Sequence, residues 1–233
     1  MKKVLKFYDS TVGKKVVVAL SGLVLLGFVV GHVTGNLKAF LGYGESGQHK
    51  LDHYAEFLRT LGEDIFGYSG FLWLVRGVLL LCIALHVVTI VQLRARNAKA
   101  NPDRYQGSNY RASSVASRSM FWGGILLATF IVYHILHFTT GTLHASFEHG
   151  AVYANIHSAF QSPIVTLFYL TSMCALGLHL YHGGWSLFQT LGVDNPDTNS
   201  MIRLGVRALS ILVVVGFVSV PLAIFLGILP PPR

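Results

Sequence analysis

The sequence predicts an all-α integral membrane protein, a bundle of five transmembrane helices with its N-terminus in the cytoplasm. Three observations predict this fold class. The 233-residue chain is 52% hydrophobic and only 12% charged, a composition unlike that of a soluble domain. Its apolar residues gather in runs of the roughly 20 residues that cross a bilayer as a helix. Its basic residues are concentrated in alternate connections between these runs.

The five runs are nearly free of charged residues. The first lies between Lys15 and Lys38, where His32 is the only ionisable side chain. In the fourth, Pro163 stands at a first-turn position, which suits the start of a helix. The predicted spans are about 16–37, 68–93, 119–141, 163–190 and 204–228. They leave too little chain for a second domain, so residues 1–233 are expected to form a single membrane domain.

The orientation follows from the basic residues. If the spans alternate, thirteen of the 18 basic residues fall on the side of the N-terminus: Lys2, Lys3, Lys6, Lys14, Lys15, Arg94, Arg96, Lys99, Arg104, Arg111, Arg118, Arg203 and Arg207. The other side holds the acids Glu45, Asp52, Glu56, Glu63, Asp64 and Glu148. The positive-inside rule then places the N-terminus in the cytoplasm and the C-terminus outside. The net charge of +8 is therefore explained without a nucleic-acid partner.

The two longest connections differ in character. The outer loop 38–67 contains "HKLDHYAEFLRTLG", whose apolar residues recur at helical spacing, so we expect a short amphipathic helix against the membrane surface. The cytoplasmic loop 94–118 is polar, basic and rich in Ser, Asn and Gly. It is predicted to be a loop that offers a docking surface.

Four histidines lie deep within separate spans: His32, His86, His134 and His179. Ionisable groups at membrane depth are rare and indicate function by default. At 1.5 Å per residue, His32 and His134 both lie roughly 24 Å from the cytoplasmic border. His86 and His179 lie roughly 12–15 Å from the same border. The sequence therefore predicts two layers of two histidines, separated by about 10 Å.

This arrangement discriminates between metals. A zinc site needs three or four protein ligands around one ion, which two such layers cannot supply. Haem iron needs only two axial protein ligands, so one histidine from each of two helices completes a centre. Two layers then predict two bis-histidine b haems within the bundle, suited to electron transfer because no axial position is open to oxygen. The sequence contains no C-x-x-C-H, which excludes covalent c-type attachment.

Several segments also resemble a known family. "SGLVLLGFVVGHVTGN", "ALHVVTIVQLRAR", "FIVYHILHF", "HLYHGGWSLFQTLG" and the outer "HYAEFLRTLG" are similar to the cytochrome b558 family over essentially the whole chain. Members of this family are the membrane anchor subunits of succinate:quinone oxidoreductases and quinol:fumarate reductases. The resemblance implies a di-haem anchor that carries electrons between an iron–sulfur subunit and quinone.

The resemblance also implies ligands, partners and location. His32 and His134 would bind the distal haem iron, and His86 and His179 the proximal one. A flavoprotein with FAD and an iron–sulfur subunit would bind on the cytoplasmic side of the inner (cytoplasmic) membrane, and the complex could form a dimer. Menaquinone is the expected quinone. Dicarboxylate chemistry would occur in the flavoprotein, because this chain has neither a dinucleotide fingerprint nor a soluble domain for flavin. The chain itself would be the quinone-reactive subunit.

Two further histidines and one departure bear on the resemblance. His137 and His182 each follow a ligand candidate by one turn, and from spacing alone either remains an alternative ligand. Relatives often have Asn at these positions, so the resemblance favours a supporting role near the haem, for example toward propionates. Some fumarate reductases carry an acid two positions before the fourth-helix ligand. Here that position is Gly177, so a proton route through that side chain is not expected.

Quinone chemistry moves protons, so its site needs groups that exchange them. The outer loop supplies His49, His53, Glu56 and Arg59 near the depth of the distal haem, and Glu56 falls where relatives place a polar group near quinone. The alternative is an amphipathic helix with ordinary surface charges. Arg76, near the outer end of the second span, could pair with a propionate or an outer acid, or extend toward the membrane surface.

Two other functions remain open. One is the cytochrome b anchor of a formate dehydrogenase or hydrogenase, against which the fifth span and the basic cytoplasmic loop argue. The other is a transporter that uses the histidines as a relay, against which the lack of internal repeats and broken helices argues.

Overall fold

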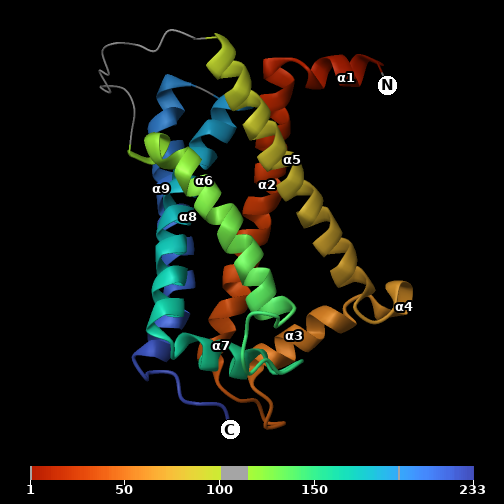
Figure 1. Cartoon of the computed structure of the whole chain (residues 1–233), viewed down its shortest axis with the longest axis vertical. Helices are drawn as coiled ribbons and strands as arrows, with labels where there is room; N and C mark the ends of the chain where they lie inside the picture. Colours follow the sequence, from red (N-terminus) through yellow and green to blue (C-terminus); the bar gives the residue numbers. More distant parts are fainter. Residues whose placement is uncertain (1, 101–114, 194) are drawn as a thin grey trace.

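The computed structural model describes residues 2–100, 115–193 and 195–233 (Figure 1). Within these residues the chain is helical and contains no strand. Five helices are long and apolar enough to cross a membrane. They comprise α2 (Thr11–Asn36), α5 (Gly70–Ala100), α6 (Val115–His134), α8 (Pro163–Thr190) and α9 (Pro196–Phe225). The prediction of five apolar spans is confirmed, and the side of the membrane that holds the N-terminus stays a prediction.

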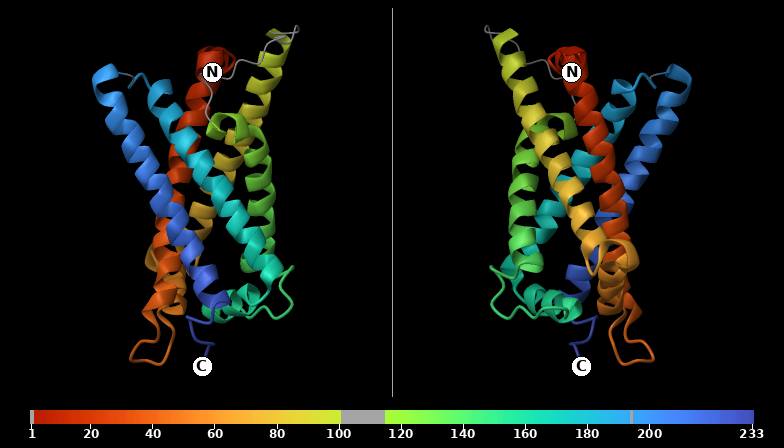
Figure 2. Two further views of the ribbon diagram at one scale, coloured as in Figure 1. Left: turned by 90° about the vertical axis from the view of Figure 1, so that its left-hand side faces the viewer. Right: turned by 90° about the vertical axis from the view of Figure 1, so that its right-hand side faces the viewer.

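The long helices run side by side, with the two chain ends at opposite ends of the bundle (Figures 1 and 2). At the N-terminal end, α1 (Lys2–Tyr8) lies across the bundle. At the opposite end, α3 (Lys50–Thr60), α4 (Glu63–Phe66) and α7 (Val152–Phe160) lie across the ends of the long helices. The predicted helix in the outer loop is therefore present as α3.

Two predicted boundaries were wrong. Residues 94–100 were expected to be loop, but α5 continues to Ala100 because Arg, Ala and Lys are good helix formers that prolong a helix into water. The rest of that loop, with Arg104 and Arg111, lies outside the described residues. The last helix begins at Pro196 rather than near 204, because the Asn195 side chain accepts the Asp197 N–H and Pro occupies the first turn.

The α6 helix ends at His134 and continues as a π-helical turn, η2 (Ile135–Thr139), which the sequence did not predict. Likewise α2 is extended by a 3-10 turn, η1 (Leu37–Leu41). Turns of the π type are rare and occur mostly inside longer helices at functional sites. Here the π turn lies directly after a candidate ligand.

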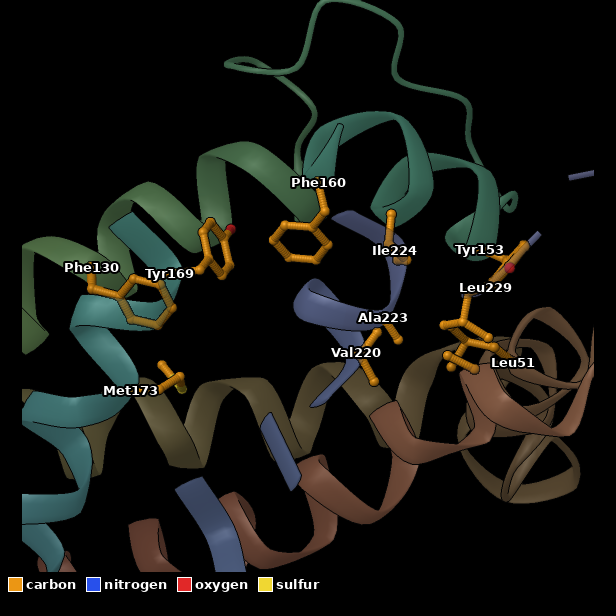
Figure 3. Packing of buried hydrophobic residues seen from close by; sticks show 11 residues of the cluster. Leu51, Phe130, Tyr153, Phe160, Tyr169, Met173, Val220, Ala223, Ile224 and Leu229 are labelled. Atoms are coloured by element: carbon orange, nitrogen blue, oxygen red, sulfur yellow. The ribbon is translucent and has the colours of Figure 1, made fainter. Parts of the chain in front are cut away.

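The buried hydrophobic core is concentrated at the C-terminal end of the bundle (Figure 3). Its aromatic part joins Phe130 of α6, Phe160 of α7 and Tyr169 of α8. Its other part joins Leu51 of α3 and Tyr153 of α7 to the last turns of α9. This core fixes the ends of α6 and α8 relative to each other, and so the position of the side chains between them.

Candidate functional site

The four deep histidines lie in two pairs. The rings of His32 on α2 and His134 on α6 have centres 5.8 Å apart, at an interplanar angle of 80°. The rings of His86 on α5 and His179 on α8 have centres 6.3 Å apart, at 54°. The structure thus brings together the same partners as the depth estimate. Their role as axial ligands stays a prediction.

The two helices of each pair are not packing neighbours in the described part of the chain. Helix α2 packs on α5, α8 and α9, whereas α6 packs on α8. Each imidazole therefore reaches its partner across a space between helices. A metal held at about 2 Å by one nitrogen of each ring would separate the ring centres by about 6 Å. Both observed separations fit a group bound between two axial imidazoles.

Aromatic side chains surround the distal pair. Phe28 stacks on His32 at 5.2 Å and 12°, and Phe217 lies 5.6 Å from the same ring. Phe130 and Phe138 lie 5.6 Å and 5.8 Å from His134. An apolar surrounding lowers the local dielectric and excludes water, two of the factors that set the potential of a bound haem.

The proximal pair has a polar contact on one side only. The Ser21 hydroxyl lies 3.2 Å from His86 Nδ1. Its own proton is donated to the Val17 and Val18 carbonyls of the same helix. By contrast, His179 Nδ1 is buried without a hydrogen-bond partner among the described residues. A small cavity of about 50 Å³ borders His179, between Gly123 of α6 and Ala175 of α8. The cavity leaves space beside the His179 ring that the described residues do not fill.

The two alternative histidines have different surroundings. His137 is 3% exposed, and its Nδ1 lies 3.1 Å from the Tyr169 hydroxyl. That hydroxyl is also 3.4 Å from His134 Nδ1, so His137 is connected to the distal pair through one side chain. His182 is half-buried one turn beyond His179 and makes no hydrogen bond within the described residues. Neither lies opposite a second histidine on another span.

Arg76 lies over the Trp73 ring at 4.7 Å and forms no ion pair in the described part of the chain. Of the interpretations that the sequence left open, an arginine that extends along its helix toward the membrane surface fits this contact best. A cation over an indole ring in such a setting is stabilised by about 0.5–1 kcal/mol.

The glycines near the histidines differ in their surroundings. Gly22 lies against His86, whose Cε1 would be 3.3 Å from an added Cβ. Gly177 and Gly184 pack on α9, where an added Cβ would lie 2.6 Å from Val214 and 2.8 Å from Val206. An added Cβ would meet nothing within 4 Å at Gly27, Gly31, Gly123, Gly124 and Gly183. Gly177 and Gly184 serve helix packing. Only the glycines without such a contact leave room beside the histidine pairs.

The quinone-site candidates lie on α3. Glu56 accepts a hydrogen bond from the Tyr68 hydroxyl at 3.2 Å and forms an ion pair with Arg59 at 3.9 Å. Desolvation and the bond to Glu56 raise the pKa of Tyr68. His53 is exposed on the same helix, and no contact joins it to the pair. The structure therefore brings together Glu56, Arg59 and a tyrosine that the sequence analysis missed.

His49 occupies a structural position. It is 4% exposed, its ring stacks on Tyr153 at 3.7 Å, and its Nδ1 accepts the Leu51 N–H as the N-cap of α3. Burial lowers the pKa of His49, and the nearby Asp52 carboxylate opposes that shift in part. Its ring is therefore not available at the surface of the bundle.

A larger cavity of about 350 Å³ lies between α2 and α5. Its lining is entirely apolar and comes from Val24, Phe28, Leu74, Val75, Val78 and Leu79. Since Phe28 also stacks on His32, the Phe28 ring lies between the cavity and the distal pair. An acyl or isoprenoid chain would suit such a lining.

The sequence analysis missed Ser21 and Tyr169, the two hydroxyls beside the histidines. The depth of each residue along its helix could have suggested both. Ser21 lies six residues past Lys15, or about 9 Å, close to the depth of His86. Tyr169 precedes His179 by ten residues, or about 15 Å, which brings it near the distal layer. What depth cannot give is the direction in which each side chain points around its helix.

No group of three or more His, Cys, Asp or Glu side chains that could hold a metal ion occurs in the described residues. Comparisons with protein-family models, with curated proteins and with solved structures found no match to this chain. The functional argument therefore rests on the residues themselves.

Proposed function

We propose that this chain is a di-haem cytochrome b membrane anchor, of the type found in succinate:quinone oxidoreductases and quinol:fumarate reductases. One observation supports it above the others. Two histidine pairs, each from helices that are not packing neighbours, have ring centres 5.8 Å and 6.3 Å apart. Two separate bis-imidazole centres at two depths suit haem iron better than any metal with three or more protein ligands.

In this proposal His32 and His134 hold the distal haem and His86 and His179 the proximal haem. A bound haem b would supply one-electron redox chemistry at each depth. The chain's own residues fix the imidazoles, through Ser21 at His86 and Tyr169 at His134, and surround the distal pair with aromatic rings. With a histidine pair holding each haem, no position would be left for oxygen, and the chemistry supplied would be electron transfer.

The basic end of the bundle is the proposed docking surface for an iron–sulfur subunit that accompanies a flavoprotein. Arg94 lies over the Phe121 ring at 3.6 Å and Arg203 over the Trp185 ring at 4.3 Å, so both cations are held at this end. The positive-inside rule puts this end on the cytoplasmic side of the inner membrane. Quinone would react at the opposite end, near Glu56 and Arg59.

The first test is spectroscopic. Purified wild-type chain should show a reduced-minus-oxidised spectrum of b-type haem with two haems per chain. Replacing His32 or His134 with Ala should remove one haem, and replacing His86 or His179 should remove the other. His53→Ala, at an exposed histidine of α3, is the matched control and should retain both. A wild-type protein without any b-type haem, after expression with haem supplied, would contradict the proposal.

A further inference from the structure

A single tyrosine hydroxyl lies between two histidines at the distal centre. Tyr169 of α8 is 5% exposed, and its oxygen is 3.1 Å from His137 Nδ1 and 3.4 Å from His134 Nδ1. All three side chains lie within the aromatic cluster around Phe130 and Phe138. Among the described residues the hydroxyl has no other hydrogen-bond partner, so it is shared between the two imidazoles.

The backbone explains why both imidazoles reach it. The α-helical hydrogen-bond pattern ends at His134, and the π turn Ile135–Thr139 follows at once with His137 on it. His137 follows His134 by three residues, so the two side chains are neighbours on the helix surface, and both Nδ1 atoms approach the same oxygen. Turns of the π type are frequent at functional sites.

We propose that Tyr169 is a positioning residue for His134, and that His137 orients the Tyr169 hydroxyl. This inference rests on the proposed function, in which His134 is an axial ligand. A neutral imidazole that binds iron through Nε2 carries its proton on Nδ1. His134 Nδ1–H then donates to the Tyr169 oxygen. The one hydroxyl proton of Tyr169 is left to donate to His137 Nδ1, so the direction of both bonds is determined.

His137 is itself fixed by a second ring. His144 stacks on it with centres 5.0 Å apart and planes at 29°. The Ser146 N–H donates to His144 Nδ1 at 3.3 Å, and His144 Nε2 therefore carries the proton that is donated to the Asn155 carbonyl at 3.0 Å. His144 is thus held by the backbone on both sides, and the ring of His137 has a rigid surface to pack on.

An acceptor at the Nδ1–H of a metal-bound imidazole makes the imidazole a stronger electron donor. A stronger donor stabilises the oxidised iron, which lowers the midpoint potential of that centre. Because the Tyr169 hydroxyl also donates to His137, its oxygen is a better acceptor than that of an isolated hydroxyl. At the proximal centre the comparable contact is that of the Ser21 hydroxyl with His86 Nδ1, whereas His179 Nδ1 has no acceptor among the described residues.

The test compares Tyr169→Phe with Tyr133→Phe in the full-length purified chain. Tyr133 belongs to the same cluster, 6.1 Å from Tyr169, and makes no hydrogen bond within the described residues. The Tyr133→Phe variant therefore loses a hydroxyl from the same aromatic cluster without losing a hydrogen bond. Redox titration followed by visible absorption should show one midpoint potential shifted to a more positive value in Tyr169→Phe. The other potential should be unchanged, and Tyr133→Phe should match wild type in both.

His137→Leu is the second variant, in case Tyr169→Phe does not retain its distal haem. It keeps the Tyr169 oxygen but removes the acceptor of its proton, so we expect a smaller positive shift of the same potential. Two potentials equal to wild type in a haem-bearing Tyr169→Phe protein would overturn the role of Tyr169. If only His137→Leu retains haem, an unshifted potential in that variant would overturn it. Absence of b-type haem from wild type would instead overturn the proposed function.

Discussion

The rings of His86 and His179 lie 6.3 Å apart, yet only His86 has its Nδ1 held by another side chain. His179 Nδ1 is buried without a partner in the described part of the chain. Leaving a buried polar group unpaired costs about 1–3 kcal/mol. The proximal site is therefore stabilised unequally from its two helices, and Ser21 supplies the polar contact on one of them.

We expect Ser21→Ala to loosen the proximal haem. The change removes the side-chain partner of His86 Nδ1, and loss of such a supporting contact typically lowers metal affinity about 10–100-fold. The measurement is the rate at which purified protein loses haem to an excess of apomyoglobin. Ser172→Ala is the control, because Ser172 is equally buried but bonds only the Phe168 carbonyl of its own helix. Equal rates of loss in both variants would contradict this role for Ser21.

The proposed ligand on α8 can be identified by replacing, one at a time, the two histidines that lie one turn apart on this helix. His179→Ala should remove the proximal haem, because His179 is the residue that faces His86. His182→Ala should retain both haems, since no contact joins His182 to a histidine of another span among the described residues. Haem counting by the pyridine haemochrome method measures both. The opposite pattern, two haems without His179 and one without His182, would move the ligand to His182.

The helix pairs and the depths of the histidines could be predicted from sequence, because apolar runs set the spans and each residue advances a helix by 1.5 Å. The rotation of each helix could not, since it depends on packing of the whole bundle. For this reason Ser21 and Tyr169 were missed, although both lie at the expected depths. Helix α7 and the π turn after His134 were missed because short elements are stabilised by tertiary contacts rather than by their own composition.

Glycine was a partly misleading signal. Gly177, two residues before His179, leaves no space there, because it packs on Val214. We expect Gly177→Ala to destabilise the folded chain by about 1–3 kcal/mol, because its Cβ would lie 2.6 Å from a Val214 methyl group that cannot move far. Thermal unfolding in detergent measures the change. Gly205→Ala is the control, since a Cβ there meets nothing within 4 Å and Ala favours the helix. A Gly177→Ala protein as stable as wild type would contradict this packing.

The outer acid Glu56 should matter for quinone turnover and not for haem. If Glu56 exchanges protons with quinone, Glu56→Gln should lower quinone reduction roughly 100-fold with two haems retained. The assay is quinone reduction by the reduced complex. Glu63→Gln, an exposed acid on the neighbouring helix α4, is the control. Equal turnover in both variants would show that the cluster of Glu56, Arg59 and Tyr68 is an ordinary surface network.

The last prediction concerns the effect of pH on the contact between α3 and α7. His49 is neutral in the fold, because its Nδ1 accepts the Leu51 N–H and its ring is buried against Tyr153. Burial lowers its pKa below the ordinary value, with Asp52 opposing the shift in part. The unfolded segment therefore binds a proton more readily than the folded one. Stability of the α3–α7 contact should fall as pH drops below about 6.5, the ordinary pKa of His, and level off below the folded pKa.

Hydrogen exchange of α3 amides between about pH 7.5 and 5.5, corrected for intrinsic rates, measures this loss. His49→Asn should abolish the dependence, because Asn caps a helix as well as any residue and does not titrate in this range. Its protection should be lower at every pH, since the stacking on Tyr153 is lost with the ring. His53→Asn, at an exposed position four residues further along, should keep the wild-type dependence. If His49→Asn retained it, protonation of a different group would have to loosen α3, and the Asp52 carboxylate that accepts the Tyr153 N–H at 2.8 Å would be the next group to replace.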